Sequence, residues 1–213
     1  MDLELSREHA LVFRLTHISN VPTILTNGLH CGNSPDADPR FHSIGNADVI
    51  ARRARRAVPA PPHGALGDYV PFYFTPWSVM LLNILTGRGV PRVAKTDLAI
   101  VTSSVSRLRD AGVRVLFTDR HAGMRSAGFF ERPEDLGRID WDILRRRDFR
   151  TDADDPGKRE RYQAEALAFR HVPVAALMGV ACYDTEAVSA LTVLMRSAPS
   201  GVPIRARREW YFA

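Results

Sequence analysis

The segment Lys158-Arg-Glu-Arg-Tyr-Gln-Ala-Glu-Ala-Leu-Ala-Phe169 carries a cationic run directly into a short apolar run that one acid, Glu165, interrupts. Read with a period of two, Glu165, Leu167 and Phe169 share one face and the intervening alanines share the other, which is typical of a buried strand. A carboxylate at the mouth of such a strand needs a cation or hydroxyl partner, because removing a charge from water is costly. A partnered carboxyl of this kind is a candidate functional group. A helix with a solvated Glu165 explains the segment equally well.

The composition indicates a single soluble domain over residues 1–213. The chain has 45% hydrophobic residues, which is enough for one sizeable core. Its 29 Lys and Arg against 24 Asp and Glu give a net charge of +5, which favours an anionic partner. Cys31 and Cys182 are too far apart in the sequence for a disulfide framework or a zinc motif, so we expect reduced thiols in the cytoplasm. The charged N-terminus and the lack of a long apolar run argue against a signal peptide and against contact with a membrane.

The first third of the chain alternates a strand, a helix and a long loop. Leu11–Thr16 reads as a strand, and Ser19–Gly28 as a helix in which Ser19 or Asn20 caps the start and Gly28 ends it. Free N–H groups at this turn can hold a phosphate, although the pattern alone favours an ordinary junction. The loop over 30–43 is long enough to suggest a function.

A helix over 45–56 carries four arginines, Arg52, Arg53, Arg55 and Arg56, with no acid between Asp48 and Asp68. Arg52 and Arg56 fall on one side of this helix and Arg53 on another. Such a cluster is usually a solvated face, but guanidinium groups also match the geometry of phosphate oxygens.

The remaining pattern indicates an α+β fold with a mixed sheet. In the strand over 68–76, Phe72 and Phe74 face one way and Tyr73 the other. The polar segment 118–121 directly follows a buried strand, at a position where side chains often function. The other expected elements are strands over 98–102, 113–117, 180–183 and 204–212, and helices over 77–85, 105–110, 133–147 and 186–195.

Several enzyme classes are excluded because their motifs are missing. The chain has no Walker loop, no G-x-G-x-x-G, no G-x-S-x-G and no C-x-x-C. His17 and His30 lack a metal-ligand spacing, and the acids over 152–155 read as a turn, so no metal site is expected.

Six segments resemble, in order and almost end to end, the DarT family of bacterial DNA ADP-ribosyltransferase toxins. They are Arg14-Leu-Thr-His17, Ile24-Leu-Thr-Asn-Gly-Leu-His-Cys-Gly-Asn-Ser34, Ser43-Ile-Gly-Asn46, Asp68-Tyr-Val-Pro-Phe-Tyr-Phe-Thr-Pro76, Phe117-Thr-Asp-Arg-His121 and Arg161-Tyr-Gln-Ala-Glu165. The resemblance implies an ADP-ribosyltransferase-like split mixed β-sheet around an NAD cleft, with flanking helices. It also implies transfer of ADP-ribose from NAD+ to a base in single-stranded DNA, which would block replication, with thymine expected first and guanine second. The implied partner is a macrodomain antitoxin, and we expect a monomer.

The resemblance also implies which residues form the site. The catalytic pair falls on Glu165 and Arg53, and the substrate loop covers roughly 118–164. Contacts with NAD+ are expected from Arg14, Leu15, Thr16, Thr23, His30, Arg53 and Tyr73. Contacts with DNA are expected from a set of basic and aromatic side chains chosen by their chemistry and not by the resemblance, because such groups suit unpaired nucleotides: Arg120, His121, Arg159, Arg161 and Tyr162. Arg14 departs from members that carry histidine there.

The chemistry of the residues agrees with this assignment. Breaking the bond between nicotinamide and ribose develops positive charge on the sugar, which a carboxylate such as Glu165 stabilises. Arginine stays protonated, so we interpret Arg53 as a cation that holds the diphosphate or the ionised base rather than as a base. Tyr69 is expected to pack and Tyr162 to stack on a nucleotide. The alternatives are an NAD-dependent enzyme acting on RNA or protein, and a non-catalytic nucleic-acid-binding module.

Overall fold

An eight-stranded sheet forms the centre of the molecule in the computed structural model, which describes residues 3–195 and 201–212. Its strands are β1 (Leu11–His17), β3 (Tyr69–Tyr73), β4 (Leu98–Ser104), β5 (Val115–Thr118), β6 (Phe129–Phe130), β7 (Glu165–Phe169), β9 (Gly179–Cys182) and β10 (Ile204–Ala206). They lie in the order β10-β9-β4-β1-β3-β7-β5-β6. Strands β9 and β10 pair in parallel and the other neighbours are antiparallel, so the sheet is mixed, as the sequence predicts.

The sheet is split between β1 and β3. These two strands share the single register pair Phe13↔Tyr73, whereas β1 pairs with β4 over its whole length, from Leu11↔Ser104 to His17↔Leu98. On the other side of the split, β3 pairs with β7 from Tyr69↔Phe169 to Tyr73↔Glu165. The part of β1 that follows Phe13 therefore borders an opening in the sheet.

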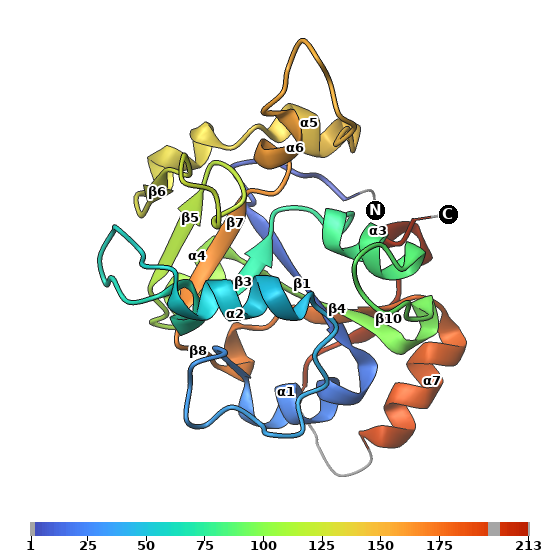
Figure 1. Cartoon of the computed structure of the whole chain (residues 1–213). Helices are drawn as coiled ribbons and strands as arrows, with labels where there is room; N and C mark the ends of the chain where they lie inside the picture. The colour runs from blue at the N-terminus through green and yellow to red at the C-terminus, as the bar shows by residue number, and fades with distance from the viewer. Residues whose placement is uncertain (1–2, 196–200, 213) are drawn as a thin grey trace.

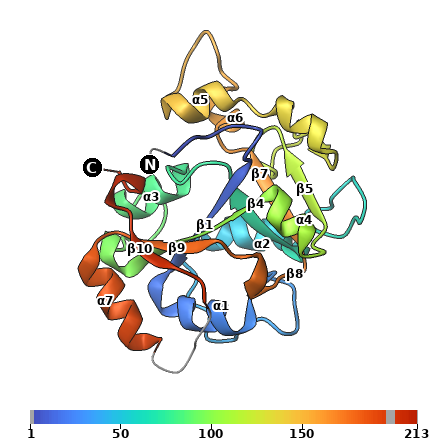
Figure 2. The same cartoon turned by 180° about the vertical axis from the view of Figure 1, so that it is seen from behind.

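Helices cover both faces and both ends of this sheet (Figures 1 and 2). They are α1 (Val21–Asn27), α2 (Ala47–Arg55), α3 (Val79–Thr86), α4 (Val105–Asp110), α5 (Trp141–Arg146), α6 (Lys158–Arg161) and α7 (Thr185–Leu194). Short 3-10 turns are η1 (Ile18–Asn20), η2 (Leu66–Asp68), η3 (Lys95–Asp97), η4 (Pro133–Arg138), η5 (Val174–Ala176) and η6 (Arg208–Trp210). A small second sheet joins β2 (Leu29–His30) to β8 (His171–Val172). Figure 1 shows α2 lying across the front of β1 and β3, over the split.

Strand β7 confirms the period-two pattern, and the helical alternative for this segment is wrong. Leu167 packs into a small cluster with Tyr69 and Leu116, while Ala166 and Ala168 pack into the main core on the other face. The small alanines leave room there for large neighbours such as Phe72, which lies opposite Ala166 in the register.

The helix predicted over 133–147 and the strand predicted over 204–212 differ most from the structure. The helix expected over 133–147 is divided into η4 and α5, because Ile139 is extended and Asp140 starts a new helix by accepting from the N–H of Ile143. The strand expected over 204–212 ends at Ala206 and is followed by η6. There Trp210 packs edge-on against Phe13, with ring centroids 5.4 Å apart.

The turn after β1 also differs from the prediction. Asn20 stands at the start of α1, but its side chain makes no cap hydrogen bond and instead binds a loop described below. Gly28 does end α1, with φ of 80°. A Cβ at this position would lie 2.3 Å from the carbonyl oxygen of Val172, so the glycine allows β2 to approach β8. Within residues 3–195 and 201–212, no helix is both long and apolar enough to cross a membrane.

Candidate active site

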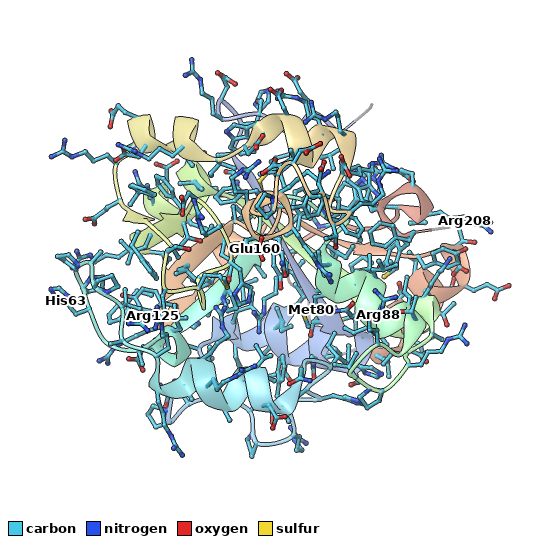
Figure 3. All side chains as sticks on the ribbon, turned by 45° about the horizontal axis from the view of Figure 1, so that its top comes forward. His63, Met80, Arg88, Arg125, Glu160 and Arg208 are labelled. Atoms are coloured by element: carbon cyan, nitrogen blue, oxygen red, sulfur yellow. The ribbon has the colours of Figure 1, made fainter. Side chains whose placement is uncertain are left out.

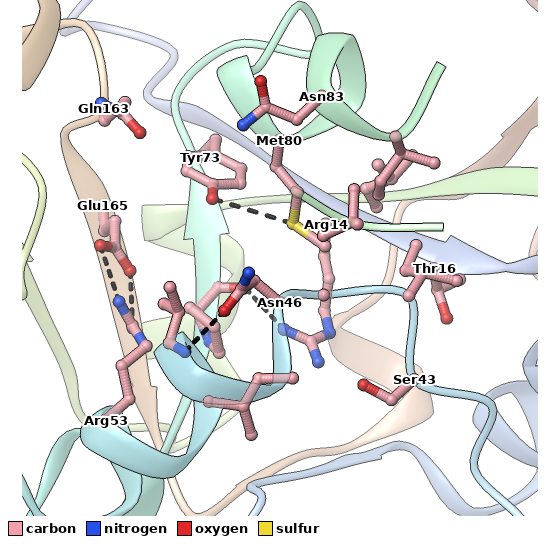
Figure 4. Close-up of a pocket in the computed structure, with 18 of the residues that line it drawn as sticks. Arg14, Thr16, Ser43, Asn46, Arg53, Tyr73, Met80, Asn83, Gln163 and Glu165 are labelled. Carbon is pink, nitrogen blue, oxygen red and sulfur yellow. Dashed lines mark hydrogen bonds and ion pairs between the residues drawn. The ribbon is translucent and has the colours of Figure 1, made fainter. Parts of the chain in front are cut away.

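The centre of the site is the carboxylate of Glu165, which is 2% exposed at the start of β7. Arg53 from α2 binds it with two parallel hydrogen bonds, Nη1 to Oε1 at 3.0 Å and Nη2 to Oε2 at 2.7 Å (Figure 4). The backbone N–H of Ala122 also donates to Oε1, at 2.9 Å. The N–H of Glu165 itself donates to Thr118 Oγ1. Two segments, helix α2 and the residues 118–122 at the end of β5, therefore fix Glu165 in place.

The electrostatics of the pair keep Glu165 ionised. Burial alone would raise the pKa of Glu165, but the charge and hydrogen bonds of Arg53 lower that pKa below its ordinary value. Burial would likewise lower the pKa of Arg53, and the carboxylate raises it instead. A buried, ionised carboxylate beside a cavity is a typical feature of a catalytic site.

Helix α2 presents Arg53 to the carboxylate although it buries none of its own residues completely. Its start is fixed by Asn46, whose side chain accepts from the N–H of Val49 and donates to the carbonyl of Gly89. Near its end, Arg56 donates to the carbonyl of Met124 at 3.2 Å. The helix is therefore anchored at both ends, and Arg53 projects inward between the anchors.

A cavity of about 260 Å³ opens beside Glu165. Strand β1, the end of β3 and helix α3 form its walls (Figure 4). A second hollow of about 680 Å³ lies against the loop over residues 31–46, which we call the cleft loop. Both are lined by Arg14, Phe41, Ser43, Ile50, Arg53 and Pro71, so the two hollows are neighbours that share a wall.

Arg14 supplies a second cation to this shared wall. Its Nη1 donates to the carbonyl of Pro71 at 3.0 Å, across the split between β1 and β3. Its buried Nε has no hydrogen-bond partner among the described residues. Burial, followed by the charge of Arg53, lowers the pKa of Arg14 to about 10, so the group is charged at neutral pH. An anionic ligand across the wall would meet both guanidinium groups.

The residues predicted to contact NAD+ divide between the two hollows. Leu15, Thr16 and Tyr73 line the smaller cavity, and Thr23 and His30 line the larger one. The hydroxyl of Thr16 accepts from Asn20, and that of Thr23 donates to Asp38 Oδ2 at 3.1 Å, so each hydroxyl already has a hydrogen-bond partner. Burial, followed by the charge of Glu165, raises the pKa of Tyr73 to about 12.

The comparison with known proteins decides the family. The family model described as "ssDNA thymidine ADP-ribosyltransferase, DarT" matches residues 13–212. The chain belongs to the DarT family. It is 42% identical, over 210 residues, to a DNA ADP-ribosyl transferase of Escherichia coli O127:H6 (strain E2348/69 / EPEC), covering 98% of this chain and 96% of that protein.

Solved DarT structures share its fold. Thermus sp. 2.9 DarT in complex with ADP-ribosylated ssDNA superposes with a TM-score of 0.82 at 32% identity, covering 96% of this chain and 97% of the other. The same Thermus protein in complex with NAD+ gives a TM-score of 0.76 at 31% identity, covering 96% and 98%. Enzymes of this family use NAD+ as a co-substrate, and the two hollows flanked by Arg14 and Arg53 suit a dinucleotide diphosphate.

Of the residues predicted to contact DNA in this DarT family member, His121 shares a cavity with Glu165. It lines the smaller cavity, and burial lowers its pKa. Arg120 is paired with Asp119 at 3.0 Å, and Arg159 accepts through its carbonyl from Gln163. Figure 3 shows the described side chains on the ribbon, with Glu160 near the centre of the view and Met80, which lines the smaller cavity, below it.

The prediction for Tyr162 is wrong, and that for Arg161 finds no support. Tyr162 is 1% exposed, its hydroxyl donates to the carbonyl of Trp77, and its ring contacts Phe149, so it stabilises the core instead of facing a nucleotide. Arg161 is held by the carboxylates of Asp140 and Asp155. The cationic run before β7 forms α6, in which Lys158 and Arg161 have carboxylate partners. Tyr69 packs in the core, as predicted, and its hydroxyl donates to the carbonyl of His63.

Sequence reasoning assigned no role to several side chains that line the cavity with Glu165, among them three that carry polar atoms or sulfur. Met80 and Asn83 come from α3, and Gln163 comes from the turn before β7. Helix α3 reads as an apolar core helix, but Met80 and Asn83 stand three residues apart and thus on one face. That spacing was the available signal. Within the described ranges, no group of three or more His, Cys, Asp or Glu side chains could hold a metal ion.

Proposed function

We propose that this chain transfers ADP-ribose from NAD+ to a thymine base in single-stranded DNA. The observation that carries the proposal is the Glu165 carboxylate, which is buried at the edge of a cavity and kept ionised by two hydrogen bonds from Arg53. Such a group stabilises positive charge far better in a site that excludes water than it would in solution. The family match and the Thermus complexes with NAD+ and with ADP-ribosylated ssDNA support the choice of both substrates.

The reaction exchanges one bond at the ribose carbon C1′ for another. The bond from C1′ to the nicotinamide nitrogen breaks, and the electron pair leaves with neutral nicotinamide. A bond forms from C1′ to N3 of thymine, and the N3 proton is released. In this scheme Glu165 accepts a hydrogen bond from the ribose hydroxyl and stabilises the positive charge that develops on the sugar.

Arg53 and His121 have different proposed roles, as a cation and as a proton acceptor. Because Arg53 stays protonated, it serves as a cation that orients Glu165 and can turn toward a phosphate or toward the ionised base. The lowered pKa of His121 leaves its imidazole neutral at pH 7, so it can accept the N3 proton directly or through water. Arg120 and Arg159 are proposed to hold the DNA backbone.

The biological setting that we propose is a toxin with a macrodomain antitoxin that removes the mark. Modified thymines would block replication, which explains why such an enzyme needs a dedicated antagonist. We place its action in the cytoplasm, where NAD+ and DNA are both available, and propose that it acts as a single-domain monomer. These proposals rest on the family resemblance.

Mass spectrometry of short oligonucleotides tests the proposal. Single strands that carry one thymine, guanine, adenine or cytosine in a common context are incubated with the protein and NAD+, and Glu165→Gln is the inactive control. We expect a mass increase of one ADP-ribose on the thymine strand, with release of nicotinamide. Modification of guanine alone would move the acceptor to that base. Labelling of RNA or of a protein instead of every DNA strand would overturn the DNA assignment.

A further inference from the structure

One polar group in the active-site cavity has no role in the mechanism above. The side chain of Asn83 projects from α3 into the cavity that Glu165 also lines (Figure 4). Its Oδ1 is buried and accepts no hydrogen bond from any described residue. Buried carbonyl oxygens are rarely left unpaired, because the desolvated acceptor costs free energy. A buried, unpaired acceptor on a residue that lines a binding cavity points to a ligand that brings a donor.

The surroundings of Asn83 limit what that ligand group can be. Met80, Ile84 and Val90 line the same cavity with apolar side chains, and Tyr73 adds an aromatic ring whose hydroxyl lies 3.9 Å from the sulfur of Met80. This combination suits a flat aromatic ring that carries an amide. A primary amide of the ligand can donate to Oδ1 of Asn83 and accept from its Nδ2 at the same time.

We propose that Asn83 binds the carboxamide of the nicotinamide group and thereby selects and positions the leaving group of NAD+. This inference rests on the proposed function, because it assumes that NAD+ occupies the cavity. Other acceptors nearby have other partners: Thr16 Oγ1 accepts from Asn20, and Glu165, held by Arg53, receives the ribose hydroxyl in the proposed reaction. The apolar wall also favours departure, since the ring is charged before the bond breaks and neutral afterwards.

The same amide chemistry occurs on the edge of a thymine, but the reaction argues against that source. The N3 nitrogen of the base attacks C1′ of the ribose, so its N–H must point toward the sugar and toward the group that takes the proton. It cannot donate to Asn83 at the same time. The carboxamide, by contrast, takes no part in bond breaking and is free to be held.

The test compares NAD+ with 3-acetylpyridine adenine dinucleotide, in which a methyl group replaces the amide nitrogen and removes the donor. With wild-type protein and a thymine oligonucleotide, kcat/KM should fall about tenfold or more with the analogue, because Oδ1 loses its donor. In Asn83→Ala the kcat/KM values of the two dinucleotides should lie within about twofold of each other, since the variant lacks the side-chain amide that distinguishes them. No described hydrogen bond involves the Asn83 side chain, so the variant should keep the wild-type melting temperature.

Gln163→Ala is the matched control. Gln163 is also an amide on the cavity wall, but its Nε2 already donates to the carbonyl of Arg159, so its removal should leave the tenfold preference in place. Equilibrium binding of both dinucleotides without DNA gives the same comparison for a variant that turns over too slowly.

The outcomes separate this inference from the proposed function. If wild type uses both dinucleotides equally, or if Asn83→Ala keeps the tenfold preference, the inference is overturned while DNA transfer still stands. A change in the preference for thymine over guanine, with the dinucleotide preference intact, would place Asn83 against the base and also overturn it. If wild-type protein neither binds NAD+ nor modifies DNA, the proposed function itself fails.

Discussion

The ion pair between Glu165 and Arg53 contributes both to the transfer activity and to the stability of the fold, and mutations can separate the two contributions. Removing Glu165 should lower transfer by roughly 10²–10³ or more, by analogy with the loss of one electrostatic stabiliser. It should also cost about 3–5 kcal/mol of stability, because Arg53, with its side chain only 15% exposed, is left as a buried charge without its partner. Pattern reasoning predicts a folded Glu165→Ala protein without a large cavity, and the pair adds this electrostatic cost.

The prediction is that the double variant Arg53→Met/Glu165→Leu recovers most of the stability lost by Glu165→Ala and none of the activity. Urea denaturation and the transfer assay measure the two quantities. Glu131→Ala is the control, because its pair with Arg114 is exposed on both sides and should be worth less than about 1 kcal/mol. A double variant as unstable as Glu165→Ala would show that the pair is held by packing and not by charge compensation.

The depressed pKa of Glu165 predicts a direction for the pH dependence of stability. In the unfolded chain this carboxyl titrates near about 4.3, and in the folded protein it titrates lower, because Arg53 outweighs the effect of burial. The folded state therefore binds fewer protons. The stabilisation is complete above the unfolded pKa and is lost as the pH falls through the folded pKa.

Comparing wild type with Glu165→Gln isolates this contribution. The difference in the free energy of unfolding between the two proteins should be constant from pH 7 to about 5 and should shrink below about 4.3. Chemical denaturation at several pH values measures it. A difference that instead changed between about pH 6.5 and about 5 would assign the titration to another group, such as His121, whose pKa burial lowers from its ordinary value of about 6.5.

At the scale of elements, the sequence pattern predicts correctly which side chains of a single strand share a face. Period two in β7 and the opposite faces of Phe72 and Tyr73 follow from side-chain alternation along a strand, which is a local property. The sequence could not show that Tyr162 packs beneath the site or that Asn20 binds a loop instead of capping α1. Both depend on partners far along the chain, Trp77 and His42.

The unexpected role of Asn20 leads to a prediction about the cleft loop, residues 31–46. The Asn20 side chain donates to the carbonyl of His42 at 2.9 Å and accepts from the N–H of His42 at 2.8 Å. The rings of His17 and His42 stack at the same place, 3.9 Å apart. Since Phe41 and Ser43 line both hollows, these contacts fix a wall of the proposed NAD+ cleft.

Asn20→Ala should raise the KM for NAD+ about tenfold, with a smaller effect on kcat, and should cost about 1–3 kcal/mol of stability, because backbone groups of His42 lose their partners. Steady-state kinetics and thermal melting measure the two effects. Thr26→Ala is the control, since this exposed hydroxyl on α1 bonds, among the residues that the structure describes, only to the carbonyl of Pro22. A variant that is less stable but has an unchanged KM would show that the loop does not hold NAD+.

The whole molecule brings together groups that the sequence keeps apart. Arg14 on β1, Arg53 on α2 and Glu165 on β7 meet because the sheet opens between β1 and β3 and because α2 covers the opening. Periodicity predicts the strands and their faces but not their order, since pairing between distant strands leaves no local pattern. The resemblance to DarT proteins predicts that these three residues form one site. It does not predict Asn83 and Met80, because none of its motifs covers α3.

The accessibility of the site predicts that single-stranded DNA is modified and that the matching duplex is not. Glu165 is nearly buried, so the acceptor base must enter the cavity itself. In a duplex the N3–H of thymine is engaged in pairing, and extruding the base costs a few kcal/mol, which corresponds to a rate roughly a hundredfold lower.

One labelled oligonucleotide is therefore assayed alone, annealed to its complement, and annealed to a strand that leaves only the target thymine unpaired, all at equal salt. We expect full labelling of the single strand and little labelling of the duplex. Labelling of the third substrate should approach that of the single strand, because its target thymine is already unpaired. Higher salt should slow all three in parallel, since Arg52 and Arg55 on exposed positions of α2 can attract phosphates but do not read the base. Equal labelling of single strand and duplex would show that the enzyme opens base pairs itself.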